Sequence, residues 1–220
     1  MDVIFDLSPG TGGPLPGGRE AAVVGCMTRS LPVHYRGPVD LLGVRFRPGA
    51  GAGFLDVDAH ELTDRQEALA DVWGVGSREW PLRLAQGSPA PGDRKRILDS
   101  MLLSRLEVAR NRTDGLMVEA ASHIVQAEGR LRIHDLARTL GLSRRQLERR
   151  FRATVGTSPK AAARIARFRA VVNALHRDPA VRLSSLALSR GYVDQAHMSR
   201  DFRALAGRSP GAYRSELRGA

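Results

Sequence analysis

Arginine side chains cluster on the outward positions of one short predicted helix in the last third of the chain. They are Arg144, Arg145, Arg149 and Arg152. A guanidinium group binds phosphate or the edge of guanine through paired hydrogen bonds, whereas like charges on one helix face repel each other in water. The cluster therefore predicts a polyanionic partner, because such a partner would relieve the repulsion.

The segment that carries these arginines occurs twice. The first copy contains Leu136, Gly141, Arg149, Phe151, Gly156 and Ser158, and the second contains Leu186, Gly191, Arg200, Phe202, Gly207 and Ser209. The offset is 50 at the early positions and 51 at the later ones, so one residue near Tyr192-Val193 is inserted in the second copy. Each copy is typical of two short helices joined by a glycine turn, which predicts a duplicated helix-turn-helix.

Charge is distributed unevenly along the 220 residues, whose formal net charge is +11. Residues 1–128 contain 14 Arg and Lys against 17 Asp and Glu, whereas residues 129–220 contain 20 against 6. The duplicated segment is therefore strongly basic and the front mildly acidic, which again favours a polyanion as partner of the C-terminal part.

Composition excludes several other classes of protein. No apolar run approaches the roughly 20 residues of a membrane helix, so no membrane contact is expected. The N-terminus lacks the pattern of a signal peptide, and we expect a cytoplasmic protein. Cys26 is the only cysteine, which excludes an internal disulfide and a thiolate metal cage, and no cofactor or metal is expected.

The elements that must position the arginines form two predicted domains. Residues 1–109 are expected to form an α+β front domain of regulatory or dimerisation type, residues 110–115 a linker, and residues 116–220 an all-α domain. In the front domain we expect strands at 3–7, 21–28 and 41–46 and helices at 64–73, 77–85 and 92–108. In the second domain we expect seven helices, at 116–127, 133–140, 143–152, 158–176, 183–189, 194–205 and 209–217.

Local signals define the two copies further. Ser143 and Gln146 have the spacing of a capping box, and Asp194 is expected to cap the equivalent helix of the second copy. The helix between the copies, at 158–176, spans roughly 28 Å. Successive major grooves on one side of DNA lie roughly 34 Å apart. One chain could therefore place two helices in adjacent major grooves without a dimer.

Residues 116–217 resemble the DNA-binding domain of the AraC/XylS family of bacterial transcription regulators. The motifs that carry the resemblance are Leu136-Ala137, Gly141-Leu142-Ser143, Leu147-Glu148-Arg149-Arg150-Phe151, Gly156-Thr157-Ser158-Pro159, Gly191-Tyr192, Asp194 to Arg200, Phe202-Arg203 and Gly207-Arg208-Ser209-Pro210. The resemblance implies a sequence-specific regulator whose partners are promoter or operator DNA and, as candidates, RNA polymerase, a small-molecule effector and a second copy of the chain.

The resemblance also implies which side chains contact DNA. Base contacts are expected from Arg145, Gln146, Arg149, Gln195, His197 and Arg200, with Gln146 less favoured because the capping box would occupy its side chain. Phosphate contacts are expected from Arg144, Arg152, Ser158, Lys160, Arg203, Arg208 and Ser209. Base contacts specify the sequence, whereas phosphate contacts position the protein.

The front domain also shows a resemblance, with a departure. Residues 43–50, continuing to 61–65, resemble the front domain of many members of the family, often a β-barrel that binds an effector or mediates dimerisation. Too few residues precede Gly49 for a barrel of about eight strands, so either Met1 is not the true start or the barrel is reduced. Arg45 and Arg47 are interpreted as solvent-facing, with an anionic effector site as the alternative. Trp73 and Trp80 are expected to pack between helices.

Three alternatives stay open from sequence alone. A nucleoid protein would bind DNA without sequence preference. A metal-dependent front-domain enzyme would need ligands such as His34, His60 and Glu61 to converge on one site. A methyl-accepting repair protein would need an activated cysteine, whereas Cys26 reads as a small buried hydrophobic residue.

Overall fold

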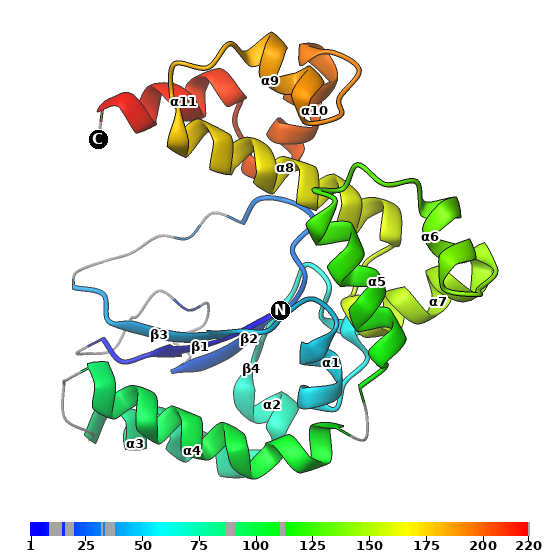
Figure 1. Ribbon diagram of the computed structural model, residues 1–220. Helices are drawn as coiled ribbons and strands as arrows, with labels where there is room; N and C mark the ends of the chain where they lie inside the picture. The colour runs from blue at the N-terminus through cyan, green and yellow to red at the C-terminus, as the bar shows by residue number, and fades with distance from the viewer. Residues whose placement is uncertain are drawn as a thin grey trace. The chain divides into compact units, whose positions relative to one another are not determined.

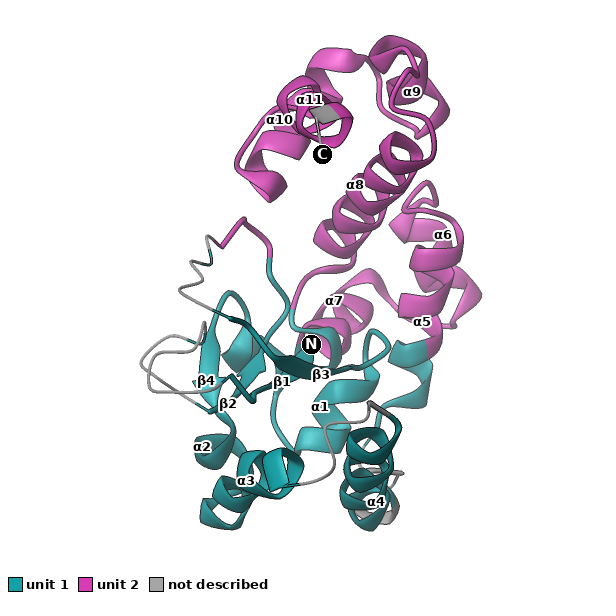
Figure 2. Cartoon of the chain, turned by 90° about the vertical axis from the view of Figure 1, so that its left-hand side faces the viewer, with its two compact units in different colours: residues 1–27, 32–118, 153–156 teal, residues 28–31, 119–152, 157–220 magenta. Residues whose placement is uncertain are grey.

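The computed structural model describes residues 1–8, 15, 20–31, 33, 38–86, 91–110 and 113–219 (Figure 1). These residues divide into two compact units, which Figure 2 colours separately. Unit 1 comprises Met1–Met27, Pro32–Val118 and Ala153–Gly156, and unit 2 comprises Thr28–Leu31, Glu119–Arg152 and Thr157–Ala220. The linker expected at 110–115 stays a prediction, and its residues Asn111 and Arg112 lie outside the described residues.

A four-stranded antiparallel sheet organises unit 1. Its strands are β1 (Asp2–Asp6), β2 (Ala21–Val24), β3 (Leu41–Arg45) and β4 (Gln66–Ala68), in the order β3-β1-β2-β4. Val3 lies opposite Val23 on one side and Val44 on the other. Because side chains alternate along a strand, Val3 and Phe5 of β1 face the same side, and both are fully buried. This few-stranded sheet confirms the α+β prediction for the front of the chain.

Helices of unit 1 pack on the apolar side of the sheet. They are α1 (Ala50–Leu55), α2 (Leu69–Trp73), α3 (Glu79–Gln86) and α4 (Pro91–Arg110), with 3₁₀ turns at Ala59–Leu62 and Val75–Arg78. The core they form with β1 and β2 includes Leu55, Leu69, Trp73, Leu84, Leu98 and Met101. The rings of Trp73 and Trp80 lie 4.9 Å apart, as expected of two tryptophans that pack between helices.

For the front of the chain, one prediction was wrong in detail and one helix was not predicted. The helix expected at 64–73 is interrupted, because Gln66–Ala68 form β4 and pair with β2, with Ala68 opposite Ala22. Helix α1 was not predicted, since glycine disfavours helices and this segment contains Gly51 and Gly53. Tertiary packing accounts for the glycine at 53: a Cβ there would come within 2.4 Å of Thr113 Oγ1.

Residues 115–219 form helices joined by short turns, and the seven expected helices are confirmed. They are α5 (Gly115–Gln126), α6 (Ile133–Thr139), α7 (Arg144–Val155), α8 (Pro159–Arg177), α9 (Leu183–Ser189), α10 (Gln195–Ala206) and α11 (Pro210–Gly219). In Figure 1 the long α8 runs from the group α5–α7 to the group α9–α11. The first copy of the repeat is thus α6–α7 and the second is α9–α10, joined by one helix of 19 residues.

Candidate nucleic-acid interface

The turn of the first copy is held by a local hydrogen-bond pattern. Gly141 has a φ of 65°, a left-handed conformation that glycine adopts without steric cost. The Leu142 amide then donates to the Ala137 carbonyl over 2.9 Å. The Ser143 amide donates to Gln146 Oε1 (2.9 Å), and the Gln146 amide donates to Ser143 Oγ (3.2 Å). The predicted capping box is present, so the side-chain amide oxygen of Gln146 already accepts a hydrogen bond at the start of α7.

Helix α7 separates its core residues from its charged ones. Leu147 and Phe151 are fully buried, whereas Arg144, Arg145, Arg149 and Arg152 are exposed. Arg144 Nε donates to Glu148 Oε1 over 3.0 Å, an exposed pair one helical turn apart. Such a pair contributes little stability, so Arg144 can leave it at a small cost. The exposed face of α7 therefore presents cations that the fold of the helix does not require.

The turn of the second copy repeats this pattern with one more residue. Gly191 has a φ of 77°, and the Tyr192 amide donates to the Ala187 carbonyl over 3.0 Å. Asp194 caps α10 by accepting from the His197 amide over 2.6 Å. Tyr192 thus matches Leu142 and Asp194 matches Ser143, which identifies Val193 as the inserted residue. Val193 is 78% exposed, so the insertion extends the turn without entering the core.

Helix α10 has the same inward side and a different outward one. Met198 and Phe202 are buried in the core, whereas Gln195, Arg200 and Arg203 are exposed. His197 is half-buried, and its ring lies edge-on to Tyr192 at 5.2 Å. Burial raises the pKa of Tyr192 to about 12, so its hydroxyl stays neutral at physiological pH. His197 is therefore packed against the turn, while Gln195 and Arg200 project freely.

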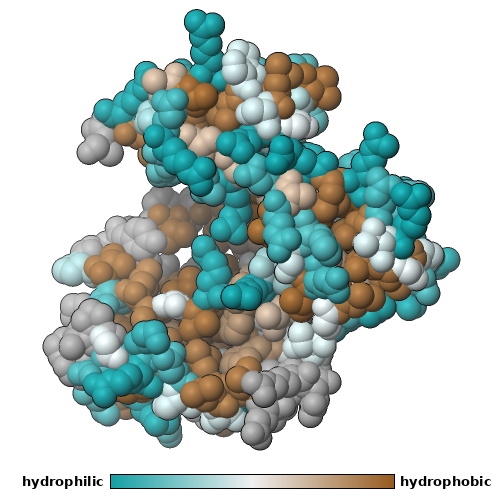
Figure 3. Space-filling model, viewed as in Figure 1, coloured by the Kyte–Doolittle hydropathy of each residue, from teal (hydrophilic) through white to brown (hydrophobic). Residues whose placement is uncertain are grey.

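The expected phosphate contacts gather at helix starts and on exposed surface. Ser158 Oγ accepts from the Ala161 amide at the start of α8, and Ser209 Oγ accepts from the Ala212 amide at the start of α11, each over 3.1 Å. Each hydroxyl keeps a proton that it can donate to an anion. Lys160 is exposed, and Arg208 forms an ion pair with Glu216. In Figure 3 hydrophilic residues dominate the surface around α8.

The side chains considered for the alternative functions are Cys26 for methyl transfer, His34, His60 and Glu61 for metal binding, and Arg45 for an anionic effector. Burial raises the pKa of the Cys26 thiol, which is the opposite of the activation that a nucleophilic cysteine requires. His60 Nδ1 lies 2.7 Å from Asp58 Oδ1, and no group of three or more metal-ligating side chains occurs among the described residues. His34 lies outside them.

Arg45 donates two hydrogen bonds to the Asp2 carboxylate, and this contact raises the pKa of the Arg45 guanidinium. The Arg45 side chain remains exposed, as expected of a solvent-facing arginine.

A group of charged residues around the turn of the second copy was not predicted from the sequence. Glu128, Arg130, Arg167 and Arg190 connect the loop after α5, the middle of α8 and the turn of the second copy. A signal for one of them was present: at the offset of 50, Arg190 replaces Leu140 of the first copy. A charged residue at a position where the other copy has an apolar one indicates a contact outside the copy itself.

Two helix-turn-helix elements joined by one helix, each with exposed cations on its second helix, define a DNA-binding protein. Residues 136–216 match a family model described as a helix-turn-helix domain, and residues 1–68 match a domain of unknown function (DUF6597). No protein with curated annotation and no solved structure shows significant similarity to the chain.

The chain therefore carries an AraC-type helix-turn-helix domain behind a DUF6597 domain, an arrangement consistent with an AraC-family regulator. This supports a DNA-binding transcription regulator, a class whose members are typically not enzymes. None of the described helices is long and apolar enough to cross a membrane.

Proposed function

We propose that this protein regulates transcription by reading a specific DNA sequence with α7 and α10, which we call the reading helices, in two adjacent major grooves. The observation that carries the proposal is the repeated geometry of the two copies. Both have a left-handed glycine turn, a capped second helix, and buried residues that are equivalent in sequence. The buried residues that stabilise each copy are similar in the two copies, whereas the exposed residues on the second helix differ.

The side chains for base contacts follow from their position on the reading helices. Arg145 and Arg149 of α7 are exposed, and their side chains form no hydrogen bond or ion pair with other residues in the described part of the chain. Gln195 and Arg200 are their counterparts on α10. Arginine pairs with guanine and glutamine with adenine, each pair contributing about 1–3 kcal/mol of discrimination. Gln146 and His197 rank lower because the capping box and the contact with Tyr192 engage them.

Phosphate contacts fit residues beside the reading helices. Arg144, Arg152, Arg203 and Arg208 would contribute charge, and the helix starts at Ser158 and Ser209 would bind phosphate through amide and hydroxyl groups. Lys160 lies in the first turn of α8, next to Ser158.

Selection of binding sites from random duplexes with the full chain tests the proposal. We expect a two-part consensus with the parts about one helical turn apart. Arg149→Ala and Arg200→Ala should each weaken binding about 5- to 150-fold and relax preference at one or two base pairs of one part only. Arg177→Ala, an exposed arginine at the end of α8, is the control. Selection without any consensus would indicate a nucleoid protein instead. If Arg149→Ala changed only the salt dependence, equally for all sequences, Arg149 would be a phosphate contact.

Other expectations remain predictions. They are effector sensing or dimerisation by the front domain, contact with RNA polymerase, and the division of the chain at residues 110–115.

A further inference from the structure

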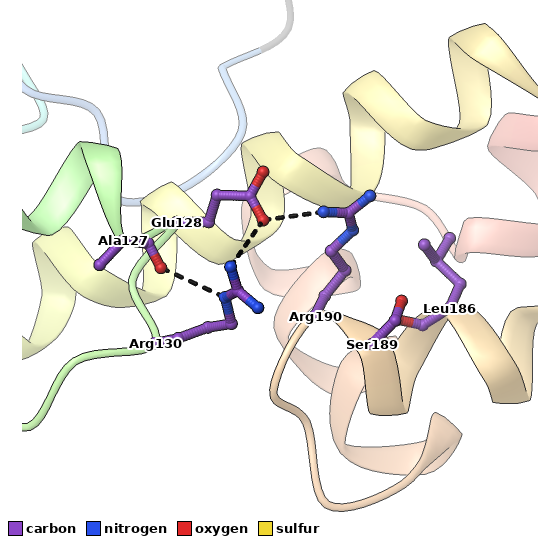
Figure 4. Close-up of polar contacts among 6 residues, drawn as sticks. All are labelled: Ala127, Glu128, Arg130, Leu186, Ser189 and Arg190. Atoms are coloured by element: carbon purple, nitrogen blue, oxygen red, sulfur yellow. Dashed lines mark hydrogen bonds and ion pairs between the residues drawn. The ribbon is translucent and has the colours of Figure 1, made fainter.

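Inside unit 2, an ion pair joins the loop that precedes the first copy of the repeat to the turn of the second copy. Glu128 lies in the loop after α5, and Arg190 precedes the glycine turn of the second copy, 62 residues later. Arg190 Nη1 donates to Glu128 Oε2 over 2.8 Å, and the two side chains are 25% and 36% exposed. Figure 4 shows the two side chains approaching from the loop and from the end of α9. The pair therefore links the loop between α5 and α6, which leads into the first copy, to the turn that precedes α10.

A second arginine fastens the same loop to the same turn. Arg130 Nη2 lies 3.8 Å from Glu128 Oε2, and Arg130 Nε donates to the Ala127 carbonyl over 3.4 Å (Figure 4). The aliphatic part of Arg130 lies against Gly191, where an added Cβ would come within 3.1 Å of Arg130 Cγ. The turn thus contacts the loop through its backbone as well as through the Glu128–Arg190 pair.

Helix α8 holds the other side of this contact. Arg167 Nη1 donates to the Gly129 carbonyl over 3.3 Å, and its guanidinium lies 5.4 Å from the centre of the Tyr192 ring. Gly129 itself lies so close to α8 that an added Cβ would come within 2.0 Å of the Ala163 carbonyl oxygen. Loop, turn and α8 therefore form one continuous contact, in which Arg167 touches both the loop and the turn.

Two observations indicate that the Glu128–Arg190 pair is not a requirement of the helix-turn-helix fold. The first copy has Leu140 at the position of Arg190 and forms the same turn. Glu128 has a φ of 50°, a left-handed conformation that is unfavourable for a residue with a Cβ. Glycine would adopt this conformation more readily, so the loop conformation itself does not favour a glutamate at this position.

We propose that Glu128 and Arg190 are positioning residues that fix α10 relative to α7 and thereby set the distance between the two DNA half-sites that the protein accepts. The proposal rests on the proposed function, since it requires both reading helices to bind DNA together. Each added base pair separates the half-sites by roughly 3.4 Å and rotates one relative to the other by roughly 34–36°. A rigid link between the copies resists that change, whereas a loose link follows it.

The test measures affinity for duplexes whose two half-sites are separated by the selected spacer or by one base pair more or less. With the wild-type chain, either change should weaken binding about 10- to 100-fold, because one reading helix loses its base contacts. Glu128→Gly, Glu128→Gln and Arg190→Leu should reduce this penalty to about fivefold or less. Arg190→Lys, which keeps the charge, should retain most of it.

Thermal unfolding of the same variants separates positioning from folding. The ion pair is partly exposed, so its loss should change stability little, and Glu128→Gly should also relieve the unfavourable backbone conformation. Asp135→Asn serves as the control, because it removes an exposed ion pair between Asp135 and Arg138 that lies within the first copy. This control should keep the wild-type spacing penalty.

The outcomes distinguish the two proposals. A steep spacing penalty in the wild type that persists unchanged in Glu128→Gly and Arg190→Leu would overturn the positioning role and leave the proposed function intact. A wild-type chain that selects no two-part site would overturn both, and the failure would be visible before any variant is measured.

Discussion

The two copies of the helix-turn-helix have equivalent buried cores and different exposed surfaces. Both bury an aliphatic or thioether side chain and a phenylalanine on the second helix, Leu147 with Phe151 and Met198 with Phe202. The first copy presents four arginines along α7, whereas α10 presents a glutamine, a half-buried histidine and two arginines. The repeated residues therefore encode the fold, and the residues that vary are the ones available to a partner.

The largest expected effect comes from removing the phenylalanine of either core. Phe151→Ala and Phe202→Ala should each lower the free energy of unfolding by about 3–5 kcal/mol. The second loss should be the larger, because Phe202 also contacts Phe168 at 4.9 Å and Tyr213 at 5.5 Å, and such ring pairs add about 0.5–1.5 kcal/mol each. Urea denaturation followed by circular dichroism measures both. Equal losses well below 2 kcal/mol would mean that the two cores do not carry the fold.

Replacing outward residues of α10 by those of α7 tests whether the two surfaces bind different DNA sequences. Gln195→Arg, Ala196→Arg and His197→Gln together give α10 the first three residues of α7. We expect the variant to lose about 1–3 kcal/mol for each lost base contact on the original duplex and to select two copies of the first half-site. Selection from random duplexes detects this. Ala196→Arg alone is the control, and an unchanged consensus in the triple variant would show that α10 does not read bases.

The helix caps should have a smaller effect that differs in kind between the copies. Ser143→Ala and Asp194→Ala each remove a cap and should cost about 0.5–2 kcal/mol of stability. Asp194→Asn keeps the capping oxygen and removes only the charge at the start of the helix, a loss of about 0.3–1 kcal/mol at low salt. Denaturation at two salt concentrations separates the contributions. An Asp194→Asn variant as unstable as Asp194→Ala would contradict the capping role.

At neutral pH the smallest difference between the copies involves Tyr192, whose contribution to stability should change only at alkaline pH. Burial raises the pKa of Tyr192 from 10 to about 12, whereas Leu142 at the equivalent position does not titrate. The folded state therefore binds the phenolic proton more tightly than the unfolded state. The resulting stability is present below pH 10 and is lost as the pH rises from about 10 to about 12. Tyr192→Phe should flatten this part of the stability profile, and a profile unchanged by the substitution would exclude the burial effect.

The C-terminal helices were predictable because their signals are local. The capping box at Ser143, the glycine turns and the spacing of buried residues each lie within one or two helical turns, and all seven helices were found. Strand β4 and helix α1 were missed because both depend on distant partners. Gln66–Ala68 are extended through pairing with β2, and the segment with Gly53 packs against Thr113.

The candidate site likewise contains residues that local sequence signals predict and residues that depend on contacts with distant parts of the chain. Outward arginines on α7 and α10 follow from helical periodicity, and their exposure agrees with it. The Glu128–Arg190 pair spans 62 residues, and no periodicity connects its partners. Only the comparison of Leu140 with Arg190 hinted at it, because the turn itself needs no charge at that position.

Helix α8 joins the copies in series, and under the proposed function this connection would give the protein a direction on DNA. A symmetric dimer reads a palindrome and looks the same from either end of its site. Two unlike reading helices placed one after the other along a single chain would read an asymmetric site, which has a left and a right end. A promoter could then specify by the direction of its site which end of the bound regulator points toward the start of the gene.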